Sequence, residues 1–135
     1  ADSPLQPYKL GEMLENSKTA DYYRRSKIAL NIFRTVQWPD ANPKFIEPNK
    51  AKSISPRCYE ALACGAMLLT DWREELDTWP QDSFVLWGDE RDLEEKMRYY
   101  LSHDEERKAI ALRGNQFVQG ETFDARSKEV LTHLE

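Results

Sequence analysis

The chain has 135 residues, of which 40% are hydrophobic, 11% aromatic and 32% charged, with a net charge of −5 at pH 7. This composition excludes a disordered chain, and the length fits one domain that can bury an ordinary core without disulfides or a structural metal. The negative charge argues against a generic binder of nucleic acids or anionic membranes. We expect residues 1–135 to form a single domain with no membrane span, since the apolar stretches fall far short of about 20 residues.

The first part of the chain predicts two strands, one helix and a long loop. A weak strand is expected at Tyr8–Leu10, a helix capped by Ser17 at Lys18–Ser26, and a second strand at Ile28–Phe33. The polar, proline-punctuated stretch Arg34–Ser55 follows. A loop of about twenty residues in a small domain is usually functional.

The rest of the chain alternates short strands with helices and then turns wholly helical. Ser55 and Pro56 predict a helix start, and Gly65 predicts its end in a left-handed conformation. A strand is expected at Ala66–Thr70. The remaining expected elements are a helical turn at Arg73–Asp77, a strand at Ser83–Trp87, a helix opened by Gly88-Asp89 with Leu93, Met97, Tyr100 and Leu101 on one face, and helices at Asp104–Val118 and Asp124–Leu134.

This order predicts an α/β fold: a partial Rossmann-like parallel sheet of three to four strands, flanked by helices and ending in a helical tail. Such a small sheet resembles the back half of a larger doubly wound domain. One sheet edge is therefore expected to be unpaired, which favours either self-association into a homo-oligomer or an unusually protected edge.

Cysteine and histidine usage bears on the compartment and on metals. Cys58 and Cys64 are six residues apart on one predicted helix and face different ways, so a disulfide is not expected and a reducing cytoplasm is. His103 and His133 stand alone in polar segments and are expected at the surface. No two aspartates are separated by a single residue, so the D-x-D metal motif of many sugar transferases is missing. The start at Ala1, without Met or a leader, favours a fragment or a processed chain.

The segment with the clearest chemistry is Ser53–Asp71. A loop that delivers backbone N–H groups to a helix N-terminus, with Arg57 in the first turn, suits a phosphate or diphosphate. Glu60, one turn further, can accept hydrogen bonds from vicinal hydroxyls such as those of a ribose. The alternative is structural: Arg57 is solvated, Glu60 pairs with a neighbouring cation, and Pro56 is ordinary punctuation.

The run Arg57-Cys58-Tyr59-Glu60-Ala61-Leu62-Ala63-Cys64-Gly65, followed by an apolar strand and Thr70-Asp71, resembles the signature of group 1 glycosyltransferases, particularly the spore-maturation-type branch. The similarity runs from about Tyr8 to Arg126. It implies a GT-B architecture, in which two Rossmann-like domains face a cleft and the C-terminal one binds a nucleotide-diphosphate sugar. The implied enzyme is a hexosyltransferase that needs no metal and no cofactor besides this donor substrate.

By this resemblance, Glu60 would bind the donor ribose, and Arg57 with the amides around Ser55 would lie near the diphosphate. The segment from Leu10 to Met13 would lie against the nucleobase. Asn31 and Arg34, at a strand end on the same rim, are weaker candidates for the donor site. The sequence departs from the family at position 52, where Lys52 replaces the first glutamate of the E-x7-E pair; a solvated lysine is favoured over a phosphate contact.

The resemblance implies that this chain is the donor-binding half and that the catalytic base and acceptor site lie in a missing N-terminal domain. The isolated fragment is then expected to be inactive. The alternative is a non-catalytic Rossmann-like module for interaction or assembly. The tryptophans offer a further alternative, a carbohydrate-stacking surface, but core or interface positions are favoured for two or three of them. They are Trp38, Trp72, Trp79 and Trp87.

Overall fold

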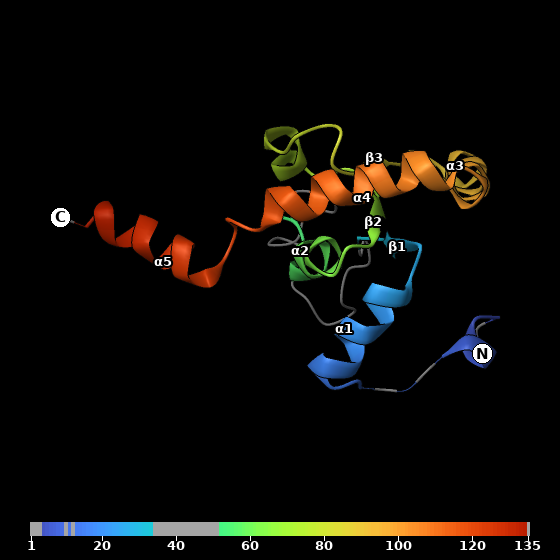
Figure 1. Ribbon diagram of the computed structural model, residues 1–135, viewed down its shortest axis with the longest axis horizontal. Coiled ribbons are helices and arrows are strands. Elements are labelled where there is room, and N and C mark those ends of the chain that lie inside the picture. The colour runs from blue at the N-terminus through green and yellow to red at the C-terminus, as the bar shows by residue number, and fades with distance from the viewer. Residues whose placement is uncertain (1–3, 10, 12, 34–51, 135) are drawn as a thin grey trace, which may run out of the picture.

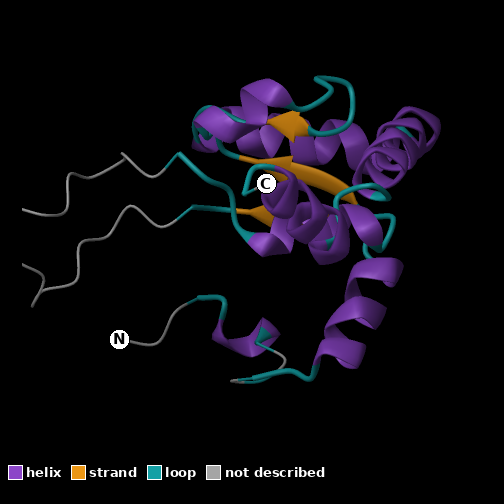
Figure 2. Ribbon diagram, turned by 90° about the vertical axis from the view of Figure 1, so that its left-hand side faces the viewer, coloured by secondary structure: helices purple, strands orange, loops and turns teal. Residues whose placement is uncertain are grey.

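A computed structural model describes residues 4–9, 11, 13–33 and 52–134, and its centre is a parallel sheet with helices on both faces (Figure 2). Arg34 and nearly all of the predicted long loop lie outside the described residues. The elements in chain order are η1 (Gln6–Tyr8), α1 (Asn16–Arg25), β1 (Ile28–Asn31), α2 (Pro56–Ala63), β2 (Met67–Thr70), η2 (Glu74–Thr78), β3 (Val85–Leu86), α3 (Glu90–Ser102), α4 (Asp104–Val118) and α5 (Phe123–Thr132), where η denotes a 3-10 helix.

The sheet has the order β1-β2-β3, and both strand pairs are parallel. Ile28 lies opposite Met67, and Leu69 lies opposite Val85. The central strand β2 is apolar apart from Thr70 and buried along its whole length, as expected for a parallel strand covered on both faces. The predicted α/β class is therefore confirmed, with three strands in the described part of the chain.

Alternate side chains of β2 supply the two sides of the core. Leu68 packs with Cys58 and Leu62 of α2, whereas Met67 and Leu69 pack with Ile110 of α4. Further along, α4 also approaches α2 closely at Gly114. A Cβ on this glycine would lie 2.6 Å from Leu62 Cδ2 and 2.6 Å from the Ser83 carbonyl oxygen. The absent side chain therefore lets α4 settle against the helix that carries the predicted site.

The predicted starts of α2 and α3 and the predicted end of α2 are confirmed. Ser55 caps α2 and accepts a hydrogen bond from the Arg57 amide at 3.3 Å, and Asp89 caps α3 through the Asp92 amide at 2.8 Å. Gly65 has a φ of 82°, which favours glycine, and it follows the end of α2. Cys58 and Cys64 are both free thiols, as expected.

The strand expected at Tyr8–Leu10 is not formed at its described residues. Tyr8 instead closes the 3-10 turn η1, in which its amide donates to the Leu5 carbonyl at 2.9 Å, and Lys9 is not part of a strand. Pro7 favours this turn because its ring fixes φ. Leu10 lies outside the described residues.

Several ends of elements also differ from prediction. The helix expected after Ser17 begins at Asn16 with Glu15 as its cap residue, and the last helix begins at Phe123, capped by Thr122. β3 is shorter than expected because the Ser83 amide folds back to the Pro80 carbonyl in a turn.

The two outer strands differ in how they end the sheet. On β3, which has only two residues, Lys96 Nζ donates to the Leu86 carbonyl at 2.7 Å, a protection typical of natural edge strands. β1 pairs only with β2 among the described residues. Leu30 within this strand is 43% exposed, and Ile32 just after its end is 53% exposed. Lys96 therefore covers the last carbonyl of β3, while β1 presents apolar side chains.

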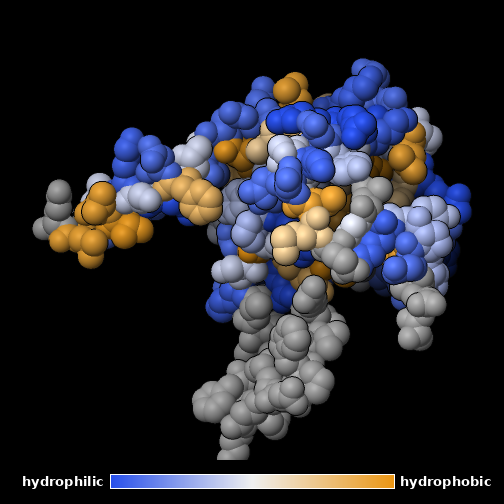
Figure 3. All heavy atoms as spheres, turned by 90° about the horizontal axis from the view of Figure 1, so that it is seen from below, coloured by the Kyte–Doolittle hydropathy of each residue, from blue (hydrophilic) through white to orange (hydrophobic). Residues whose placement is uncertain are grey.

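The C-terminal helix α5 projects from the body of the molecule (Figure 1). None of its described residues is buried, and apolar side chains gather towards its far end (Figure 3): Val130, Leu131 and Leu134. Among the described residues, no helix combines the length and apolarity needed to span a membrane.

Candidate functional site

The carboxyl ends of the strands are tied together by side chains that fold inward. Asn31 is only 5% exposed, and its amide nitrogen donates to Thr70 Oγ1 across β1 and β2 at 3.0 Å. Asp71 accepts the Phe33 amide at 3.1 and 3.2 Å with its two carboxylate oxygens. Trp87 Nε1 donates to the Asn31 carbonyl at 3.4 Å. These polar groups therefore hold the strand ends in place.

The first turn of α2 has a different character. Ser55 Oγ accepts from the Arg57 amide and also from Arg57 Nε at 3.2 Å, which draws the arginine back over the helix start. Pro56 has no N–H and the Arg57 amide is accepted by Ser55, so few backbone amides of the first turn lack an acceptor. The amides of Ser53 and Ser55 donate to no described acceptor. An anion here would meet these two amides, the helix dipole and an exposed guanidinium.

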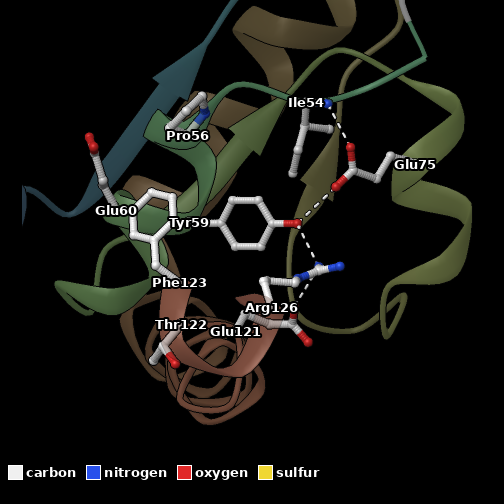
Figure 4. Close-up of a pocket in the computed structure, with 9 residues that line it drawn as sticks. All are labelled: Ile54, Pro56, Tyr59, Glu60, Glu75, Glu121, Thr122, Phe123 and Arg126. Atoms are coloured by element: carbon white, nitrogen blue, oxygen red, sulfur yellow. Dashed lines mark hydrogen bonds and ion pairs between the residues drawn. The ribbon is translucent and has the colours of Figure 1, made fainter. Parts of the chain in front are cut away.

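A carboxylate from η2 fixes the loop in front of α2. Glu75 Oε2 accepts the Ile54 amide at 2.9 Å, and Glu75 Oε1 accepts the Tyr59 hydroxyl at 2.8 Å (Figure 4). Burial, and next the hydrogen bond to this carboxylate, raise the pKa of Tyr59 to about 12. Glu75 therefore connects the loop and the helix that carry the predicted anion site.

Lys52, Glu75, Ile54 and Tyr59 form a clamp that holds the loop before α2. Its carbonyl accepts the Glu75 amide at 3.1 Å, and its Nζ forms an exposed ion pair with Glu74 at 2.9 Å. This pairing agrees with the sequence expectation of a solvated lysine at the position where the family's first glutamate stands.

A pocket of about 300 Å³ opens between α2 and the start of α5 (Figure 4). Its apolar wall is formed by Ile54, Pro56, Phe123 and the ring of Tyr59. Phe123 is 91% exposed, and its ring projects from α5 towards Glu60 and Tyr59. Such a combination of an apolar wall with a few polar groups is typical of small-molecule sites.

The polar groups of this pocket are mostly acidic. Three glutamates line it, Glu60, Glu75 and Glu121, against one arginine, Arg126. Arg126 forms an ion pair with Glu121 at 2.5 Å and reaches Tyr59 Oη at 3.5 Å. Glu60 also lines a second hollow of about 240 Å³ on the other side, next to Tyr23.

Glu60 and Arg57 stand near each other on α2, and both are exposed. The charge of Glu60 adds to burial in raising the pKa of Tyr23, while the charge of Arg57 opposes it. Neither the Glu60 carboxylate nor the Arg57 guanidinium forms an ion pair with a described residue. The structural alternative for Glu60, a neighbouring cation as partner, is therefore not seen among the described residues.

The structure thus gathers three of the predicted donor residues, Ser55, Arg57 and Glu60, on the start of α2. Asn31 lies at the strand ends with its amide engaged, and Met13 precedes α1 with 92% of its surface exposed. Sequence reasoning did not find Glu75, Phe123 or Arg126 as site residues. Each comes from another element, and only the tertiary structure brings them to α2.

The described tryptophans favour structural positions. Trp79 is buried, with its ring 4.9 Å from Tyr59 and 5.0 Å from Phe117, and Trp87 packs against the core of β2. Trp72 is exposed, and its Nε1 donates to Asp77 at 2.8 Å. The expectation of core positions for two of them is confirmed, and Trp38 lies outside the described residues.

A family model described as glycosyl transferase-like matches residues 4–132, nearly the whole chain. No curated protein and no solved structure gives a significant match.

Proposed function

The chain belongs to the glycosyl transferase-like family, and on that premise we propose that it binds a nucleotide-diphosphate sugar at the start of α2. The observation that carries the proposal is the pair Arg57 and Glu60. Both are exposed on one helix beside a pocket, and neither has an ionic partner among the described residues. One supplies a cation and the other an acceptor, the two functions that a diphosphate and a ribose require.

In this proposal the diphosphate lies at the N-terminal end of α2. Arg57 offers a permanently charged, forked donor, and the amides of Ser53 and Ser55 add neutral donors. When the glycosyl group is transferred to an acceptor hydroxyl, negative charge grows on the leaving diphosphate. Groups already aimed at that position lower the barrier because they need no reorganisation.

Glu60 receives the ribose, because a carboxylate can accept hydrogen bonds from two neighbouring hydroxyls. Glu75 acts indirectly. It accepts the Ile54 amide and the Tyr59 hydroxyl, and so fixes the position of the loop relative to α2. The catalytic base and the acceptor site belong, in this proposal, to a second domain.

We further infer a reducing compartment such as the cytoplasm from the two free thiols.

Calorimetric titration tests the proposal. The protein is titrated with UDP and GDP and with their sugars, and Arg57→Ala and Glu60→Ala are each expected to weaken binding about tenfold or more. Arg98→Ala is the matched control, because Arg98 is exposed on α3 and pairs with Glu94. No binding of any nucleotide by the full-length protein, or equal binding by all variants, would contradict the donor site.

A second candidate function is favoured by one observation, the apolar side chains along β1. Leu30 and Ile32 are half-exposed next to an edge that pairs with no further described strand. They suit a module that associates with a second copy of this chain. Sedimentation over a concentration series separates the two functions: an assembly module forms dimers without nucleotide, and a monomer at all concentrations rejects it.

A further inference from the structure

We propose that the pocket between α2 and α5 receives the nucleoside end of the donor, with the base stacked on Phe123. This inference rests on the proposed function and deepens it. It assigns the base to a different part of the chain from the segment around Met13 that the family resemblance indicated.

The charge of the pocket decides which end of the donor enters. The lining has three glutamates against one arginine, and the guanidinium of that arginine is already paired with Glu121. A diphosphate would be repelled from such an interior, whereas an uncharged nucleoside would not. The anionic part is therefore left outside, where Arg57 stands.

Glu60 fixes the position of the ribose relative to the pocket. Glu60 lines the cavity at its rim, where its carboxylate points away from Tyr59 and Arg126 (Figure 4). This carboxylate has no ionic partner among the described residues. The ring of Phe123 lies beside the Glu60 side chain (Figure 4), so a ribose held at the rim by Glu60 has this ring within reach of its base. The pocket volume of about 300 Å³ lies at the lower end of the usual range for small-molecule sites.

Phe123 supplies what a base requires. A phenylalanine that is 91% exposed presents a free aromatic face, and every nucleobase can stack on such a face. Tyr59 forms the neighbouring wall, and Arg126 and Glu121 offer a donor and an acceptor at the far side of the cavity. In this arrangement, α5 takes part in donor recognition through its first turns.

The test measures dissociation constants of the full-length protein for UDP, GDP and ADP and for UDP-glucose and GDP-mannose. Phe123→Ala is expected to weaken the preferred diphosphate and its sugar by the same factor, about tenfold, because both lose the stacked base. Phe123→Tyr should bind as the wild type does. Leu131→Ala is the matched control, because Leu131 is an exposed apolar residue of α5 that does not line the pocket.

Three results would overturn the inference. If Phe123→Ala weakens the sugar nucleotide but not the diphosphate, the pocket holds the glycosyl ring instead. If Met13→Ala weakens binding and Phe123→Ala does not, the base lies against Met13. If Phe123→Ala binds as Leu131→Ala does, the pocket is not used. In all three the proposed function survives, whereas a protein that binds no nucleotide would end both proposals.

Discussion

The carboxyl ends of the strands and the first turns of α2 both carry polar residues, but they use them in opposite ways. At the strand ends, the side chains of Asn31 and Asp71 form hydrogen bonds with neighbouring protein groups. On α2, Arg57 and Glu60 remain exposed, without an ionic partner in the described part of the chain. The first set holds the fold together, and the charges of the second set are accessible to a ligand.

The difference shows how to separate framework from site in a small α/β domain. A buried polar side chain with its hydrogen bonds made is costly to remove, because its partner loses them too. An exposed charge without a partner contributes little to folding. Substitutions in the two regions should therefore change different quantities, stability in one and ligand affinity in the other.

The largest loss of stability is expected from Asn31→Ala. The change leaves the Thr70 hydroxyl without its donor in a buried place and opens a small cavity, so the free energy of unfolding should fall by about 2–3 kcal/mol. Urea denaturation measures it, with Asn16→Ala, an exposed asparagine of α1, as the control. A variant as stable as the control would mean that the strand ends are not held as described.

Cys58 provides a test of burial under α2. Desolvation raises the pKa of its thiol to about 11 from a reference of 9.0. Because the native state then holds its proton more tightly than the unfolded state, this contribution is complete below pH 9 and is lost as the pH rises through 11. Between pH 9 and pH 11, the free energy of unfolding of the wild type, measured by urea denaturation, should therefore fall by up to about 2 kcal/mol.

Cys58→Ala should show a smaller fall between pH 9 and pH 11, even though it is less stable at pH 7. The comparison of the two slopes isolates the contribution of the thiol. Identical slopes would contradict a buried thiol at this position.

Glu75→Gln should have an intermediate effect, because this residue joins the two regions. The carboxylate serves both the Ile54 amide and the Tyr59 hydroxyl, whereas an amide offers a single oxygen acceptor. We expect a loss of about 1 kcal/mol in stability together with weaker nucleotide binding. Glu74→Gln is the control. If Glu75→Gln equals this control in stability and in nucleotide affinity, Glu75 does not hold the loop and helix together.

The smallest change in stability is expected where the proposed change in binding is largest. Arg57→Ala and Glu60→Gln should alter the free energy of unfolding by no more than about 0.5 kcal/mol. Thermal unfolding without ligand gives this value. A loss of several kcal/mol would show that these side chains belong to the framework.

Local signals in the sequence predicted much of this organisation. Ser55 and Pro56 marked the start of α2, Gly65 marked its end, and the apolar run before Asp71 gave the central strand. Each of these signals acts within a few residues, through a cap, a left-handed glycine or a buried strand. The same signals indicated Arg57 and Glu60, because both lie on the helix that they delimit.

Features that depend on distant contacts were not predictable in this way. Nothing near Glu75 in the sequence indicates that its carboxylate reaches both Ile54 and Tyr59. The hydrogen bond of Asn31 to Thr70 joins two strands that are far apart in the sequence, so no local pattern predicts it. The 3-10 turn that replaces the weak strand expected at Tyr8–Leu10 has a local cause, because Pro7 lies within it and favours a turn.

The central claim is that the ligand meets α2 and the loop before it, and amide chemical-shift mapping with saturating nucleotide tests it most directly. The account predicts the largest shifts at Ser53, Ser55 and Glu60, with small ones at Asn31 and Asp71. The opposite pattern, with shifts concentrated at the strand ends while α2 is unaffected, would contradict it.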